Sequence, residues 1–106
     1  MARTEYELQL QSDFFATYLP RVDKSLTIEE IQTAVAKKFS VTLQQIISPE
    51  RTASLVTPRQ LAMYIARKLT PKSLQEIADA FGKKHATILH GVKTIKERLE
   101  NEIDLK

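Results

Sequence analysis

Apolar residues recur every three or four positions over most of the chain, which is the spacing that places them on one face of an α-helix. The first clear run covers residues 28–39, and Thr27 followed by Glu30 forms a capping box in front of it. A second capping box, Thr42 with Gln45, precedes a short run that ends before a proline. The pattern therefore predicts a helix and then a short helix in this part of the chain.

The segment that follows, residues 48–57, lacks periodicity and is predicted to be a loop. Thr57 is suited to cap the next helix and Pro58 to fill its first position, where the missing N–H costs nothing. The inward face of this helix is expected to consist of Leu61, Ala62, Ile65, Ala66 and Leu69. Thr70 and Pro71 end it.

Residues 73–92 have the pattern of two helices packed across a tight turn. Ser73 and Glu76 form a capping box at the start, and Gly82 supplies the positive φ that the turn needs. The positions expected to face the core are Ile77, Phe81, Ile88 and Val92. In a helix-turn-helix, the second helix would present its first residues to the major groove of DNA. An ordinary helical hairpin has the same features, so the pattern alone leaves both interpretations open.

Residues 4–19 are weakly amphipathic and end at Pro20. We expect residues 1–25 to be a linker or an N-terminal helix and residues 26–106 to form the folded domain. Two glycines, no tryptophan and an abundance of good helix formers predict an all-α fold. The expected architecture is a compact helical bundle of five to six helices that contains the helix-turn-helix.

Several classes of protein are disfavoured by composition. The chain has no cysteine, which excludes a disulfide framework and a thiolate metal site. His85 and His90 face different sides of a helix, and no serine stands in a spacing that singles out a nucleophile, so we expect no metal, no cofactor and no enzymatic activity. Nothing resembles a signal peptide or a membrane span, which predicts a soluble, cytoplasmic protein.

Charge is unevenly distributed along the chain. Residues 51–98 carry ten basic and three acidic side chains, whereas residues 1–50 carry five basic and seven acidic ones. A basic block of this kind suggests a surface that faces a polyanion such as nucleic acid. A solvated charged face, or an adaptor whose basic face meets an acidic partner protein, would give the same distribution.

Three stretches of the sequence resemble the C-terminal DNA-binding domain (domain IV) of the DnaA family of bacterial chromosomal replication initiators. Residues 26–32 read Leu-Thr-Ile-Glu-Glu-Ile-Gln, like the opening of that domain. Residues 57–70, which begin Thr-Pro-Arg-Gln-Leu-Ala-Met, are similar to a Pro-Arg-Gln-x-Ala-Met helix and give the most specific match. Residues 73–90 are similar to the helix-turn-helix of the family.

The resemblance implies sequence-specific binding of double-stranded DNA, with a helix in the major groove and a basic loop in the adjacent minor groove. Arg51 matches the minor-groove arginine, and a guanidinium is favourable in a narrow A·T groove. Arg59 and Gln60 match residues that hold the DNA backbone and reach toward the groove. Since Arg59 is expected in the first turn of its helix, where it opposes the helix dipole, a phosphate contact suits it better than a role in stability. His85 and Thr87 match members of the base-reading helix. The turn expected in the major groove comprises Lys84, His85, Ala86 and Thr87, and Lys83 and Lys84 add positive charge near the phosphates.

The turn departs from the family pattern, which is usually Gly-Gly-Arg-Asp-His-Thr-Thr-Val. This chain has Gly-Lys-Lys-His-Ala-Thr-Ile, one residue shorter, with Lys84 in place of the acidic residue and Ala86 in place of a threonine. A lysine cannot accept from the amino group of cytosine and favours guanine or a phosphate instead. Ala53 and Thr57 also stand where basic residues are usual. We therefore expect a different preferred site or weaker specificity.

The 106 residues contain no glycine-rich phosphate loop, so the ATPase of the initiator family is not expected in them. The chain is either a fragment of a longer initiator or a free-standing DNA-binding protein, such as a transcriptional regulator with its own target site. The start at Met1 and the altered turn favour the second interpretation. The expected role is in replication initiation at the origin or its regulation, in the bacterial nucleoid, with other replication proteins as further candidate partners. The oligomeric state stays open.

Overall fold

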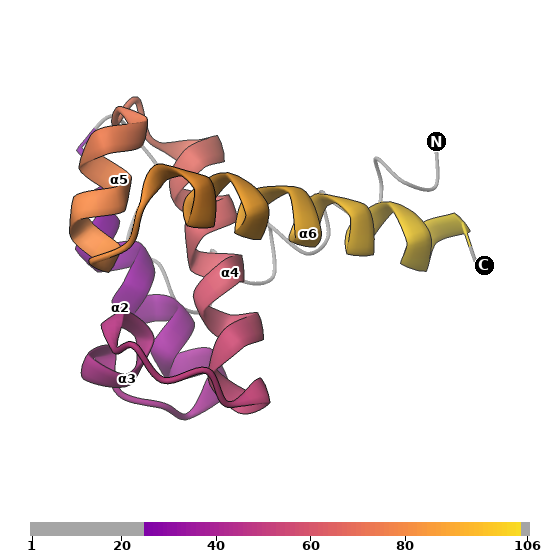
Figure 1. Cartoon of the computed structure of the whole chain (residues 1–106), viewed down its shortest axis with the longest axis horizontal. Helices are drawn as coiled ribbons and strands as arrows, with labels where there is room; N and C mark the ends of the chain where they lie inside the picture. Colours follow the sequence, from indigo (N-terminus) through magenta and orange to yellow (C-terminus); the bar gives the residue numbers. More distant parts are fainter. Residues whose placement is uncertain (1–24, 105–106) are drawn as a thin grey trace.

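The computed structural model describes residues 25–104, which are helical apart from short connections (Figure 1). Its helices are α2 (Ile28–Phe39), α3 (Leu43–Ile47), α4 (Ala53–Leu69), α5 (Leu74–Phe81) and α6 (His85–Asp104). The predicted all-α bundle is thereby confirmed for the described residues, and the amphipathic stretch at residues 4–19 lies outside them. None of the described helices is both long and apolar enough to cross a lipid bilayer.

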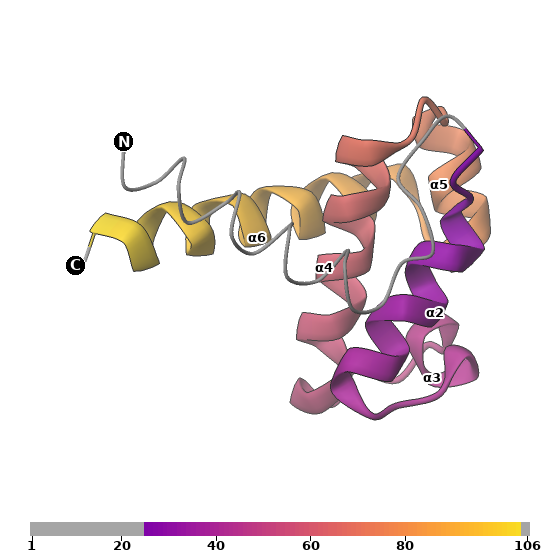
Figure 2. The same ribbon diagram turned by 180° about the vertical axis from the view of Figure 1, so that it is seen from behind.

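The long helix α4 is the centre of the bundle. It packs most extensively against α6, which crosses it, and against α2, which lies beside it. Figures 1 and 2 show this arrangement from opposite sides, with α5 next to the start of α6 and with α6 running on past the other helices. α4 contacts every other described helix and therefore holds the bundle together.

Three helices begin at the capping boxes that the sequence predicts. In each, the backbone N–H of the third residue donates to the capping hydroxyl, and the side chain of that residue accepts from the backbone N–H of the cap. The first of these distances is 3.1 Å for Thr27–Glu30, 3.0 Å for Thr42–Gln45 and 3.1 Å for Ser73–Glu76. The hydrogen bonds from Ser73 also lower the pKa of the Glu76 carboxyl.

The prediction for the start of α4 is wrong. Thr57 and Pro58 were expected to open this helix, but it begins at Ala53, so that residues 53–57 form an additional turn. Pro58 cannot donate to the carbonyl four residues before it, and the loss of one hydrogen bond costs about 1 kcal/mol. The additional turn buries Leu55, which is only 3% exposed, and full burial of a leucine contributes about 1.5–3 kcal/mol. Packing therefore outweighs the local signal.

Helices α2 and α5 end in the same backbone geometry. Ser40 and Gly82 both lie in the left-handed region, with φ of 58° and 62°. The next residue in each case, Val41 or Lys83, donates its N–H to the carbonyl five positions earlier, at 2.9 and 3.0 Å. This is the Schellman arrangement, in which a glycine is usual at the left-handed position. The predicted role of Gly82 is confirmed, whereas Ser40 has the same conformation without a glycine.

The core lies where α2, α4, α5 and α6 meet. The helix-turn-helix prediction is confirmed here, since Ile77, Phe81 and Ile88 are fully buried and Val92 is partly buried. The largest fully buried side chains are Phe81, Leu26, Ile31, Ile46, Met63, Ile77, Ile88 and Val35. One continuous core therefore fixes α5 and α6 against the rest of the bundle.

The two left-handed positions give a first prediction. Replacing Ser40 by Gly should raise the free energy of unfolding, and replacing Gly82 by Ala should lower it, each by about 1 kcal/mol, because a Cβ is strained at positive φ. Apart from the glycine itself and its two chain neighbours, no residue has an atom within 4 Å of the Cβ that would be added at Gly82, so strain and not a clash accounts for the second effect. Urea unfolding measures both, and a destabilised Ser40→Gly variant would contradict the argument.

Candidate nucleic-acid interface

The first turn of α6 is open to solvent. Lys84, His85, Ala86 and Thr87 are all exposed. The backbone N–H groups of Thr87 and Ile88 donate to the Lys84 carbonyl at 3.0 and 3.2 Å, so the helix starts there. The first amides of any helix lack intrahelical acceptors and carry partial positive charge. The predicted exposure of this turn is confirmed, and Lys84 adds a full charge to it.

His85 is held by a residue of α5. Its Nε2 lies 2.7 Å from Gln75 Oε1, and the amide group of Gln75 donates to Asp79 Oδ1, also at 2.7 Å. A carbonyl oxygen only accepts, so in this contact the proton is on Nε2 of the ring. The imidazole at the start of α6 is therefore oriented by the preceding helix. Gln75 was not predicted as part of the site, because a contact across the turn leaves no trace in the periodicity of the sequence.

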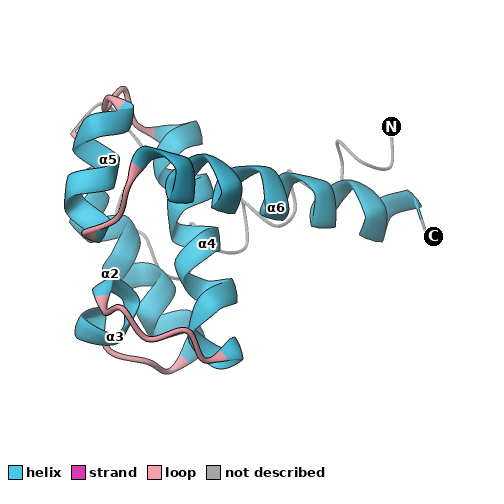
Figure 3. Cartoon of the chain, viewed as in Figure 1, coloured by secondary structure: helices cyan, strands magenta, loops and turns pink. Residues whose placement is uncertain are grey.

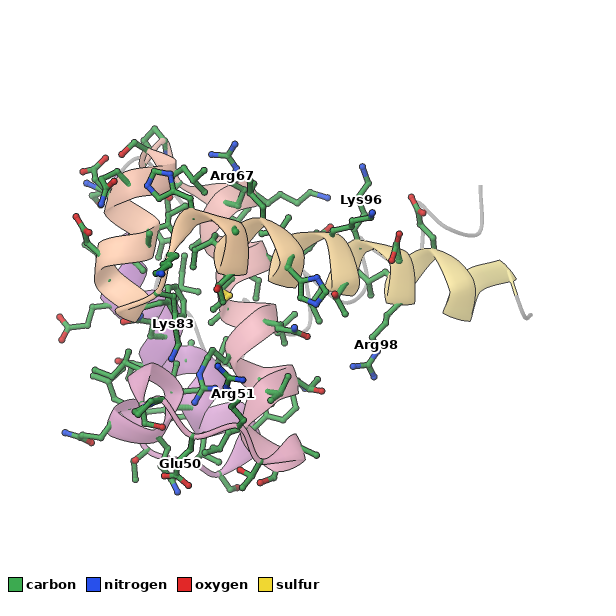
Figure 4. The ribbon with its side chains drawn as sticks, viewed as in Figure 1. Glu50, Arg51, Arg67, Lys83, Lys96 and Arg98 are labelled. Carbon is green, nitrogen blue, oxygen red and sulfur yellow. The ribbon has the colours of Figure 1, made fainter. Side chains whose placement is uncertain are left out.

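The connection between α3 and α4 carries the predicted minor-groove residue. Arg51 is exposed in this connection, directly before the cap of α4. In Figure 3 the α3–α4 and α5–α6 connections both face the viewer, so that Arg51 and the start of α6 belong to one side of the molecule. Figure 4 shows the side chains of Arg51 and Lys83 on that side.

The position of Arg59 differs from the one expected from sequence. It lies well beyond the first turn of α4 and is 5% exposed. Its guanidinium donates to the carbonyls of Ile46 (2.6 Å), Glu50 (2.7 Å) and Gln45 (2.8 Å), and more weakly to Ser48 Oγ (3.3 Å). Burial lowers the pKa of Arg59, and the Glu50 carboxylate acts in the opposite direction. Arg59 therefore has a structural role that was not expected, because four of its five N–H donors are used inside the protein, and its contact with a phosphate stays a prediction.

Lys83 connects the two loops. Its Nζ donates to the backbone carbonyl of Ser48 at 3.0 Å, across 35 positions of sequence. The side chain is partly buried, and this burial, followed by the positive charges of Arg59 and Arg51, lowers the pKa of Lys83. The α5–α6 connection is therefore tied directly to the loop that presents Arg51.

Gln60 lies where α6 crosses α4. A Cβ added to Gly91 would come within 2.9 Å of Met63 Sδ and 3.3 Å of Gln60 Cγ, so glycine allows the two helices to approach closely. A glycine inside a helix is destabilising by about 1 kcal/mol relative to alanine, and such a residue often indicates close packing. Gly91 was a signal of this contact in the sequence. Gln60 itself is partly buried, with its stem against α6.

Comparison with known proteins places this site in a family. The family model for the bacterial dnaA protein helix-turn-helix matches residues 28–95. The chain belongs to this family. It is 43% identical over 102 residues to the chromosomal replication initiator protein DnaA of Cereibacter sphaeroides, and 38% identical over 103 residues to that of Rickettsia canadensis. The alignments cover 95% and 96% of this chain but 22% of each relative, so the chain spans about a fifth of their length.

In this family member, α5, the Gly82 turn and α6 form the helix-turn-helix. The predicted site residues around it are of two kinds. Arg51 and the turn from Lys84 to Thr87 are exposed and free to meet a partner surface. Arg59, Lys83 and Gln60 are buried or partly buried and contact other parts of the protein. Whether any of them touches DNA stays a prediction.

Removal of the buried guanidinium is a second test. Arg59→Met should lower the free energy of unfolding by about 2–4 kcal/mol, because it removes the donors that the carbonyls of Ile46 and Glu50 accept from. Arg67→Met is the matched control, since Arg67 is exposed on the same helix and its replacement should change stability by less than about 0.5 kcal/mol. Equal unfolding midpoints in urea for the two variants would contradict the structural role of Arg59.

Proposed function

We propose that this protein binds double-stranded DNA, with the first turn of α6 in the major groove and Arg51 in the adjacent minor groove. The observation that carries this proposal is that the first turn of α6 and the Arg51 loop lie on the same side of the molecule. An exposed, basic helix start and an exposed arginine loop face the same way and are joined by the hydrogen bond from Lys83 to Ser48. Membership of the helix-turn-helix family supports the same conclusion.

The candidate residues are suited to different contacts with DNA. Lys84 can donate to guanine O6 or N7 or to a phosphate, and His85 and Thr87 offer polar groups to base edges. The methyl group of Ala86 can contact the methyl group of a thymine. Arg51 carries the charge suited to a narrow, electronegative A·T groove. Gln60, at the crossing of α4 and α6, is a further candidate for the DNA backbone.

The preferred site should differ from that of typical family members. Lys84 stands where the family has an acidic residue, and the turn is one residue shorter. Each lost or inverted base contact changes discrimination by about 1–3 kcal/mol. A binding-site selection from random duplexes should therefore return a sequence other than the standard initiator box, and recovery of that box would refute this part of the proposal.

The biological setting follows from the names of the relatives. The proteins from Cereibacter sphaeroides and Rickettsia canadensis are chromosomal replication initiators. We infer that the DNA binding of this chain serves replication initiation or its regulation at an origin, in the nucleoid. A non-enzymatic role fits a helix-turn-helix domain. Other replication proteins are candidate partners under the same proposal.

Salt dependence gives the third prediction. The affinity for duplex DNA should fall by about 0.9 log unit per log unit of salt for each phosphate neutralised. Arg51→Ala should weaken binding most on duplexes with an A·T-rich flank. Lys37→Ala removes an exposed cation of α2, a helix that carries neither of the two candidate DNA-contacting elements, and should leave the affinity nearly unchanged. Little duplex affinity at low salt would favour an adaptor for an acidic protein.

The base preference of the α6 turn gives the fourth prediction. Lys84→Asp should move the preference at one base pair from guanine toward cytosine, because a carboxylate accepts from the cytosine amino group and a lysine cannot. Lys72→Asp makes the same change of charge at an exposed position between α4 and α5, and should weaken binding without altering base preference. Selection with both variants is the measurement. An identical consensus for the two would show that Lys84 reads no base.

A further inference from the structure

The backbone of Ser48 is the point where the two candidate DNA-contacting elements meet. Its carbonyl accepts the hydrogen bond from Lys83 Nζ at 3.0 Å, and its Oγ accepts from Arg59 Nη2 at 3.3 Å. The same hydroxyl donates to the carbonyl of Gln45 at 3.0 Å. Ser48 is therefore held from α3, from α4 and from the α5–α6 connection at once.

The hydrogen bond between Lys83 and Ser48 joins two points of the chain that lie next to the candidate DNA-contacting elements. Lys83 directly precedes Lys84, the first residue of the exposed turn, while Ser48 stands three residues before Arg51. Any change in the distance between Lys83 and Ser48 moves the α6 turn relative to Arg51. Because the chain segments from Lys83 to Lys84 and from Ser48 to Arg51 are short, the hydrogen bond restricts how far the α6 turn can move relative to Arg51.

The charge around Lys83 argues against a simple surface role. Its ammonium group is partly buried close to two guanidinium groups, those of Arg59 and Arg51. Burial and repulsion both act against a cation there, and its pKa is lowered for these reasons. A lysine that served only to contact a phosphate would lie outside, as Lys84 does. The compensating interaction of Lys83 is the one with the Ser48 carbonyl.

We propose that Lys83 is a positioning residue, which fixes the spacing between the α6 turn and the Arg51 loop through the Ser48 carbonyl. The protein then reads the major-groove and minor-groove parts of its target as one unit with a fixed separation. The inference rests on the proposed function. It adds that specificity depends on the spacing within the site as well as on its bases.

The experiment uses the duplex that the wild-type protein itself selects, and the same duplex with one base pair inserted between the two contacted segments. The wild type should bind the inserted duplex at least about tenfold more weakly, as for a misplaced contact. In Lys83→Met, which keeps the apolar stem and removes the donor, this ratio should fall toward one. The slope of affinity against salt should stay unchanged, because Lys83 neutralises no phosphate in this scheme.

Two further variants make the result specific. Lys83→Arg retains a donor for the Ser48 carbonyl and should restore most of the discrimination. Lys72→Met removes an exposed ammonium group between α4 and α5 and leaves the Lys83–Ser48 contact intact, so it should discriminate like the wild type. Hydrogen exchange of the amides at residues 50–52, measured without DNA, should be faster in Lys83→Met than in either of them, and this comparison keeps the test valid if one variant binds poorly.

The outcomes separate the inference from the proposed function. A salt slope reduced by about 0.9 in Lys83→Met, with an unchanged ratio between the two duplexes, would make Lys83 a phosphate contact and overturn the inference alone. Unchanged amide exchange in the connection would do the same. A wild type with no salt-dependent affinity for duplex DNA would overturn the proposed function, and the inference with it.

Discussion

A buried arginine determines the form of the candidate site. The Arg59 guanidinium is almost completely removed from solvent, which is unfavourable for a charge unless its donors are satisfied. The acceptors come from the carboxyl end of α3 and from the connection after it, where the carbonyls of Gln45, Ile46 and Glu50 converge. A cation at the end of a helix is also favoured by the helix dipole. The carboxyl end of α3, a helix of five residues, is thus capped by a side chain from α4.

The same interaction restricts everything that follows along the chain. Arg51 directly follows Glu50, so the carbonyl that Arg59 fixes is the one that precedes the exposed arginine. The helix that carries Arg59 is in turn packed against α6 at the close approach of Gly91. The two candidate DNA-contacting elements are therefore attached to one rigid helix as well as to each other through Lys83. A loop that would otherwise sample many conformations presents Arg51 in a restricted set of positions, which lowers the entropy lost on binding.

Local features of the fold were predictable from sequence, and features set by distant contacts were not. The capping boxes at Thr27, Thr42 and Ser73 and the left-handed turn at Gly82 depend on residues within one helical turn, and each was found where expected. The start of α4 depends on the burial of Leu55 by other parts of the bundle. Thr57 and Pro58 therefore predicted the wrong start for this helix. The exposure of the α6 turn followed from the helix-turn-helix pattern, in which the second helix presents its first residues. The roles of Arg59 and Gln75 did not follow, because their partners lie 9 to 14 and 10 positions away.

The basic block between residues 51 and 98 therefore contains both cations that stabilise the fold and cations that face solvent. Arg59 is turned inward and stabilises a loop, Lys83 is partly buried between the two connections, and Arg51 and Lys84 face solvent. Only charges that face solvent can displace counterions from DNA, so net charge overstates the electrostatic part of binding. Loss or gain of an exposed cation that contacts only phosphates would change the affinity alone. A change at Arg59 would instead alter the geometry with which Arg51 is offered, and both affinity and specificity would change together.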